Sequence, residues 1–161
     1  MVSVMLSNQQ FLSLFQSQIP FELTASQKRA LPMLTDFVCE TNDNHVFILN
    51  GYAGTGKTTV VSALVKTLKL LQQKCILLAP TGRSAKVFSL YSSQKAYTIH
   101  KCLYRMKLQD GISAFARREN KSVNTLFIVD EASMIADSES ETPLFGNRSL
   151  LDDLFSFVFE G

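Results

Sequence analysis

The sequence predicts an α/β fold in which helices flank a parallel sheet. Three apolar runs of strand length do not alternate with polar positions, and each is followed by polar or glycine residues: Val46–Leu49, Cys75–Ala79 and Leu126–Val129. Such runs are typical of strands that are buried on both faces of a parallel sheet. A helical pattern separates the first two runs, and a strand–helix–strand unit of this kind makes a right-handed crossover.

Apolar spacing predicts the helices. The helix between the first two runs has an apolar face, formed by Val60, Val61, Leu64, Val65 and Leu68. Its opposite face is polar and is formed by Ser62, Lys66, Thr67 and Lys69. Further helices are expected at about residues 24–40, 82–91, 99–107 and 150–158, and Pro32 is expected to kink or break the first of these. Scattered apolar residues near the N-terminus predict an appended helix, and the polar residues 137–148 predict a loop.

The composition excludes several classes of protein. The chain has 161 residues, enough for one domain, and its 46% hydrophobic and 19% charged content is ordinary for a soluble globular protein. No apolar run approaches the ~20 residues needed to span a bilayer. The net charge of +2 is too small to indicate nucleic-acid binding by itself. The three widely spaced cysteines are expected to be reduced thiols, which predicts a cytoplasmic location.

A phosphate-binding loop is predicted directly after the first apolar run. Gly51–Thr58 matches the P-loop pattern and precedes the amphipathic helix, so backbone N–H groups and the helix N-terminus would face an anion. The alternative is a glycine-rich turn that binds nothing, but motif and context together favour a P-loop NTPase that binds ATP with Mg²⁺. The predicted nucleotide-binding residues are Gly51, Gly54, Thr55, Gly56, Lys57, Thr58 and Thr59.

Two carboxylates follow the third apolar run. A parallel sheet brings the carboxyl ends of its strands to one edge, so Asp130 is expected near the metal ion held by Thr58. Glu131 is then placed to orient or deprotonate the attacking water, with Lys57 at the β- and γ-phosphates. Alternatively, two acids simply end a strand and cap the next helix. The P-loop upstream favours ATP hydrolysis.

Four segments resemble the motifs I, Ia, Ib and II of superfamily 1 helicases, in order and spacing: Gly51–Thr59, Ala79–Ala85, Thr98–His100 and Val129–Met134. The RecD-like and Dda-like 5′-to-3′ DNA helicases are the most similar group, and the resemblance covers residues 24–135. It implies a RecA-like sheet and an ATP-dependent motor that acts on DNA.

The resemblance assigns single-stranded DNA contacts to two segments. Its predicted contact residues are Pro80, Thr81, Arg83, Thr98 and His100. The alternative makes both threonines helix N-caps and leaves the arginine as a solvated surface charge, although a threonine can have both roles. Gln27 resembles the adenine-reading glutamine of the family's Q motif. Thr24 and Gln27 equally match a capping box, which needs no ligand.

The resemblance also implies that the chain is incomplete. A superfamily 1 motor has two RecA-like domains, and the Gly-Asp…Gln segment of the family's third motif does not occur in this sequence. We therefore expect an N-terminal appendage over residues 1–22 and a partial RecA-like motor domain over residues 23–161. The expected partners are single-stranded DNA and the remaining motor domains of a full-length helicase, with no membrane.

The third-motif strand lies centrally in the family's sheet, so its loss is expected to expose unpaired strand edges. We therefore expect a non-native oligomer, no unwinding and little ATP turnover. Phe155–Phe159 alternates like a strand and is an internal candidate for the vacant place, although a helix is favoured there. Two other functions remain open, a nucleotide-dependent switch module and a small-molecule kinase. A switch has no need of Glu131, and a kinase gives no reason for Asp130–Ser133.

Overall fold

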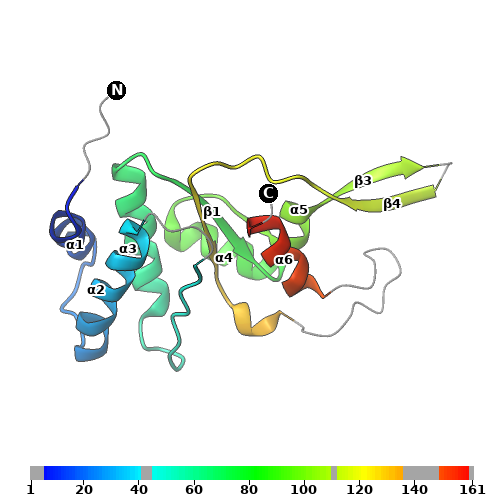
Figure 1. Ribbon diagram of the computed structural model, residues 1–161. Helices are drawn as coiled ribbons and strands as arrows, with labels where there is room; N and C mark the ends of the chain where they lie inside the picture. Colours follow the sequence, from blue (N-terminus) through cyan, green and yellow to red (C-terminus); the bar gives the residue numbers. More distant parts are fainter. Residues whose placement is uncertain (1–5, 41–44, 110–111, 136–148, 160–161) are drawn as a thin grey trace. The chain divides into compact units, whose positions relative to one another are not determined.

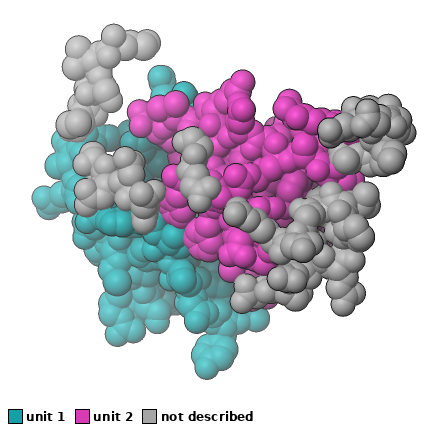
Figure 2. Space-filling model, turned by 45° about the vertical axis from the view of Figure 1, so that its right-hand side comes forward, with its two compact units in different colours: residues 1–74, 91–93 teal, residues 75–90, 94–161 magenta. Residues whose placement is uncertain are grey.

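The computed structural model describes residues 6–40, 45–109, 112–135 and 149–159. The chain divides into two compact units, one formed by residues 1–74 and 91–93 and the other by residues 75–90 and 94–161 (Figure 2). The second unit contains a three-stranded parallel sheet with accompanying helices, which confirms the predicted α/β class.

The described part of the first unit contains the helices α1 (Asn8–Ser17), α2 (Ala25–Cys39) and α3 (Lys57–Leu70) (Figure 1). Capping boxes begin α1 and α2, because in each the N-cap hydroxyl and the glutamine three residues later bond reciprocally to backbone N–H groups. The fully buried rings of Phe11 and Phe15 belong to α1, which packs against both other helices. The predicted N-terminal helix is thus confirmed, and its two phenylalanines lie in the core of this unit.

Two details of α2 and α3 differ from the prediction. Pro32 does not break α2, which runs from Ala25 to Cys39 with the proline inside it. Ser62 and Thr67, expected on the solvent face of α3, are buried, whereas Lys66 and Lys69 are exposed as predicted. Small hydroxyl side chains are tolerated in a packed interface, so α3 is covered over a wider arc than its apolar residues indicate.

The hydroxyl of Thr35 on α2 is buried and has no hydrogen-bond partner among the described residues. Because an unpaired buried hydroxyl carries a desolvation cost, Thr35→Val is expected to raise the free energy of unfolding by about 1 kcal/mol. Thr67→Val is the matched control: its buried hydroxyl donates to the Ala63 carbonyl oxygen at 2.9 Å, so this change is expected to give no gain. Urea denaturation measures the free energy of unfolding of both variants. Equal changes in the two would contradict the conclusion that the Thr35 hydroxyl is unpaired.

The predicted strand Val46–Leu49 is not formed by the described residues. The segment before the P-loop has no strand assignment, and Val46 and Ile48 are 55% and 83% exposed. Phe47 is half-buried and its ring lies 5.5 Å from that of Phe37 on α2. An apolar run forms a strand only when a neighbour supplies its backbone hydrogen bonds, and no described residue pairs with this one.

The second unit contains the sheet, whose strands lie in the order β2 (Ala96–Thr98), β1 (Lys74–Ala79) and β5 (Thr125–Val129). The register pairs Leu77 with Ala96 and Ala79 with Thr98. The described residues of the unit also form η1 (Ala132–Met134) and the helices α5 (Ile99–Leu103), α6 (Leu150–Phe159) and most of α4 (Gly82–Ser92), whose last two residues fall in the first unit. The strands β1 and β5 and the helices α4 and α6 agree with the prediction, whereas β2 was missed.

The helix expected over residues 99–107 ends at Leu103, and a hairpin follows. Its strands β3 (Tyr104–Gln109) and β4 (Ile112–Arg117) are antiparallel, from the pair Tyr104–Arg117 to the pair Gln109–Ile112. The helical prediction is wrong here because residues 104–108 alternate apolar and polar positions, which is the two-residue period of a strand.

The core of the second unit lies among β1, α5 and α6. Six buried side chains form it: Leu78, Ile99, Leu103, Tyr104, Leu154 and Phe157. Residues 155–159 lie within α6, so the strand alternative for this segment is wrong. The predicted loop at 137–148 lies outside the described residues.

Candidate functional site

The P-loop depends on its glycines. Gly54 and Gly56 have φ values of +78° and +79°, in the left-handed region that glycine adopts without strain. A Cβ added to Gly56 would lie 2.5 Å from Nε2 of Gln27, and one added to Gly51 would lie 2.9 Å from the Thr55 hydroxyl oxygen. A side chain at Gly54 or Gly56 would therefore strain the backbone, and one at Gly51 or Gly56 would displace a neighbouring side chain. The loop leads directly into α3, which begins at Lys57.

The ammonium of Lys57 lies within the loop. It donates to the carbonyl oxygen of Tyr52 at 2.9 Å and to that of Gly51. The hydroxyl of Thr55 also donates to the Tyr52 carbonyl oxygen, at 2.8 Å, and closes the turn. A cation inside a glycine loop at the N-terminus of a 14-residue helix suits an anionic phosphate. The loop therefore fits the nucleotide that its sequence predicts.

Gln27 uses both ends of its side-chain amide. Its Oε1 accepts a hydrogen bond from the Thr24 N–H at 3.0 Å, and the Thr24 hydroxyl accepts from the Gln27 N–H. Its Nε2 donates to the Thr55 carbonyl oxygen at 3.2 Å. The capping-box interpretation is confirmed, and the structure adds a bond from Gln27 to the P-loop that the sequence did not indicate.

In the second unit, Asp130 and Glu131 follow β5. The Asp130 N–H donates to the carbonyl oxygen of Leu78, 3.0 Å away, which fixes the carboxylate at the end of β1. One oxygen of Asp130 accepts from the Glu131 N–H at 3.0 Å. Glu131 has φ 55° and ψ 37°, a left-handed conformation that costs a non-glycine residue roughly 1–2 kcal/mol. Its side chain is exposed and makes no capping bond to η1, which does not favour the capping alternative.

Both predicted DNA-contact threonines are helix N-caps. The Thr81 hydroxyl accepts from the Ser84 N–H at 3.1 Å at the start of α4, and the Thr98 hydroxyl accepts from the Lys101 N–H at 3.2 Å at the start of α5. Arg83 is exposed. His100 is exposed too, and its ring lies 6.0 Å from that of Tyr104.

The predicted DNA-contact residues and Asp130 of the second unit lie at the same edge of the sheet. Ala79 pairs with Thr98, Thr81 lies two residues beyond that pair, and Asp130 bonds to Leu78. The first unit holds the P-loop and Gln27. The expected sharing of one metal ion by Thr58 and Asp130 joins residues of different units, and it stays a prediction.

The three cysteines are free thiols, and each is half-buried. Burial is the main cause that raises the pKa of Cys39, Cys75 and Cys102. The charge of Asp36 raises the pKa of Cys39 further, whereas the Gln94 hydrogen bond and the Arg118 charge partly lower those of Cys75 and Cys102. Raised pKa values keep thiols protonated and unreactive, so none has the features of a nucleophile. Among the described residues, no group of His, Cys, Asp and Glu side chains is arranged to hold a metal ion by itself. Within the same residues, no helix has the length and apolar character to cross a membrane.

Comparisons with known proteins identify the family. The model of an AAA domain family, AAA_19, matches residues 35–147, which is more than half of the chain. An uncharacterized protein of Methanocaldococcus jannaschii is 35% identical over 147 residues, which cover 83% of this chain and 12% of that protein.

Two relatives have named activities. The ATP-dependent DNA helicase dda of Enterobacteria phage T4 is 36% identical over 83 residues, covering 51% of this chain and 18% of the helicase. The multifunctional conjugation protein TraI of Escherichia coli K12 is 29% identical over 125 residues, covering 73% of this chain and 6% of TraI. The chain thus spans less than a fifth of the length of each of these relatives.

Proposed function

Because the chain belongs to the AAA_19 family of AAA domains, we propose that it is the ATP-binding part of a superfamily 1 DNA helicase. The finer proposal is a RecD-like or Dda-like motor that couples ATP hydrolysis to 5′-to-3′ movement on single-stranded DNA. The observation that carries the proposal is the glycine loop, which holds the Lys57 ammonium at the start of α3. The similarity to a phage DNA helicase supports DNA as the substrate.

The nucleotide site is proposed as follows. Lys57 would exchange its bonds to the Gly51 and Tyr52 carbonyl oxygens for the β- and γ-phosphate oxygens of ATP. Thr58 and Asp130 would hold Mg²⁺, which when bound neutralises charge on the phosphates. Glu131 would orient or deprotonate water. Its strained backbone supports this role, because strain of this kind concentrates at functional sites.

Gln27 and Thr59 complete the proposed nucleotide contacts. The Gln27 amide already bonds to Thr24 and to the P-loop carbonyl of Thr55, and its Nε2 has a second N–H that could contact adenine. Nucleotide binding and the position of the P-loop would then be linked through one side chain. Thr59 is half-buried in the first turn of α3, where its hydroxyl would support the loop.

Single-stranded DNA is proposed to bind along the sheet edge of the second unit, at Pro80, Thr81, Arg83, Thr98 and His100. The capping role of Thr98 does not exclude this, because a hydroxyl that accepts a cap bond keeps a proton to donate to phosphate. The remaining motor domains of a longer helicase are the proposed partners, and the cytoplasm is the proposed location.

The DNA part of the proposal is tested by Arg83→Ala. The arginine is exposed just beyond the carboxyl end of β1. Replacing its side chain by alanine would remove the proposed contact with a DNA phosphate. We expect single-stranded DNA binding to weaken, with a salt dependence lower by about one phosphate contact, while nucleotide affinity stays unchanged. Fluorescence anisotropy of a labelled oligothymidylate at several salt concentrations measures both quantities.

Lys74→Ala is the matched control for this test. Lys74 is an exposed cation at the opposite end of β1, so its removal makes the same charge change away from the proposed DNA edge. It is expected to leave the salt dependence unchanged. If Arg83→Ala lowered nucleotide affinity and spared DNA binding, the assignment of this segment to DNA would be wrong.

A further inference from the structure

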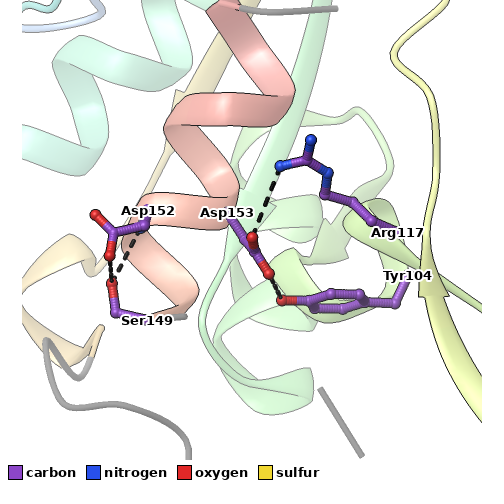
Figure 3. Close-up of polar contacts among 5 residues, drawn as sticks. All are labelled: Tyr104, Arg117, Ser149, Asp152 and Asp153. Carbon is purple, nitrogen blue, oxygen red and sulfur yellow. Dashed lines mark hydrogen bonds and ion pairs between the residues drawn. The ribbon is translucent and has the colours of Figure 1, made fainter. Parts of the chain in front are cut away.

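One buried carboxylate holds both strands of the hairpin at its root. Asp153 on α6 is 5% exposed. Its Oδ2 accepts a hydrogen bond from the Tyr104 hydroxyl at 2.5 Å, and its Oδ1 lies 3.7 Å from Nη1 of Arg117 (Figure 3). Tyr104 and Arg117 are the root pair in the register of β3 and β4. The same carboxylate therefore binds one residue of each strand.

The root carries further bonds at the same point. The Arg118 side chain donates through Nε to the Tyr104 carbonyl oxygen at 3.0 Å, and the Arg118 N–H donates to the Leu103 carbonyl oxygen at 2.7 Å. A two-stranded ribbon has little stability of its own in water. The contacts at its root therefore decide how the hairpin is oriented relative to α5 and α6.

The buried position of Asp153 is not explained by stability alone. Burying an ionised side chain carries a desolvation penalty of several kcal/mol, and an apolar replacement is often as stable. Burial, followed by the hydrogen bond and charge of Asp153, raises the pKa of Tyr104, so the phenol stays protonated and keeps donating at neutral pH. What the pair adds over an apolar contact is direction, because a hydrogen bond at this distance constrains the angle of both groups.

The tyrosine also connects the root to a proposed DNA residue. α5 ends at Leu103, directly before Tyr104, and the ring of His100 lies 6.0 Å from the Tyr104 ring. α5 packs against α6 as well as against β3. A change in the orientation of Tyr104 therefore changes the position of the His100 ring and of α5, whose N-cap is Thr98.

We propose that Asp153 is a positioning residue, which holds Tyr104 and Arg117 so that the hairpin root and His100 keep one orientation for binding single-stranded DNA. This inference rests on the proposed DNA-binding function. Asp153 itself contacts no DNA in this account.

The sign of the effect separates positioning from charge. A carboxylate near a nucleic-acid site repels phosphate, so deleting it should strengthen binding if only its charge mattered. Asp153→Ala is instead expected to weaken oligothymidylate binding about tenfold, as loss of a charge-assisted hydrogen bond would. Asp152→Ala is the matched control, because this neighbour is exposed, bonds to the Ser149 hydroxyl at 2.8 Å and carries the same charge (Figure 3). It should leave DNA affinity equal or higher.

A second variant and a second readout guard against general unfolding. Tyr104→Phe keeps the ring and all charges, and removes only the hydroxyl that bonds to Asp153. We expect amide hydrogen exchange in β3 and β4 to accelerate about tenfold or more in Tyr104→Phe and Asp153→Ala, but not in Asp152→Ala. Nucleotide affinity should be the same in all three variants. If Asp153→Ala does not fold, Tyr104→Phe decides.

The outcomes are distinguishable. Weaker DNA binding together with faster exchange in the hairpin supports the inference. Three outcomes overturn the inference and leave the proposed function intact. They are faster exchange with unchanged DNA affinity, unchanged hairpin exchange in both Tyr104→Phe and Asp153→Ala, and tighter DNA binding by Asp153→Ala. If the unmodified protein binds no oligothymidylate at low salt, the proposed DNA function fails first, and the positioning role fails with it.

Discussion

Lys57→Ala is expected to lower nucleotide affinity by about 100-fold or more, because a charge-assisted contact to phosphate contributes about 3 kcal/mol. Lys57 supplies the fixed positive charge of the loop, and its ammonium is already held there by two backbone carbonyl oxygens. When nucleotide binds, the ammonium would exchange these two bonds for phosphate oxygens, and alanine has no group that can make this contact. Isothermal titration calorimetry with a non-hydrolysable ATP analogue measures the change.

Lys69→Ala is the control for Lys57→Ala. Lys69 is exposed in the last turn of the same helix, α3, so the variant changes the net charge equally without touching the loop. It should bind nucleotide like the unmodified protein, and thermal unfolding should show both variants folded. Equal affinity of Lys57→Ala and the unmodified protein would remove the P-loop assignment.

Phe157→Ala is expected to lower the free energy of unfolding by about 3–5 kcal/mol, the usual cost of deleting a buried aromatic ring. The ring is 7% exposed in the core of the second unit and meets Phe127 of β5 edge-on, with the centroids 6.0 Å apart. Phe155 on the same helix is 40% exposed, so Phe155→Ala should cost about 1 kcal/mol or less. Urea denaturation of the two variants measures the difference.

This pair of variants also separates helix from strand for residues 155–159. In α6, Phe155 stacks on Phe159 with the centroids 5.9 Å apart, while Phe157 points to the core. In a strand, these three rings would lie on one face and their removal would cost similar amounts. Equal losses for Phe155→Ala and Phe157→Ala would therefore contradict the helical structure.

Features determined by a few neighbouring residues could be predicted from the sequence. The capping box of Thr24 and Gln27 requires two side chains three residues apart, and the entry of the P-loop into α3 requires a short motif. The strands β1 and β5 were also predicted, because each is a single apolar run with a polar end. In these cases local propensity and tertiary packing favour the same structure.

The failed predictions have different causes. Val46–Leu49 has the pattern of a buried strand, but strand formation depends on a neighbour that the pattern cannot specify. The hairpin was missed although residues 104–108 alternate and an Asp-Gly dipeptide, typical of hairpin loops, follows at positions 110 and 111. That signal was available. Pro32 was overestimated as a helix breaker, since packing on both sides of it maintains α2.

The candidate site was predictable in residue type but not in geometry. The pattern identifies Lys57 and Glu131, yet it does not predict the carbonyl partners of the lysine or the left-handed backbone of the glutamate. The contact of Asp153 with Tyr104 joins residues 49 positions apart. Sequence periodicity places Asp153 in the first turn of a helix, beside a second acid, and gives no reason to connect it to the hairpin.

The central claim, that the loop over residues 51–58 binds nucleotide phosphate, is tested most directly by following its backbone amides. A two-dimensional ¹H–¹⁵N NMR titration with a non-hydrolysable ATP analogue and Mg²⁺ reports each N–H group separately. We expect saturable shifts concentrated at Gly54, Gly56 and Lys57, with smaller shifts at Gln27, which bonds to the loop. Saturable shifts confined to other parts of the chain, or no shifts with folded protein, would contradict the central claim.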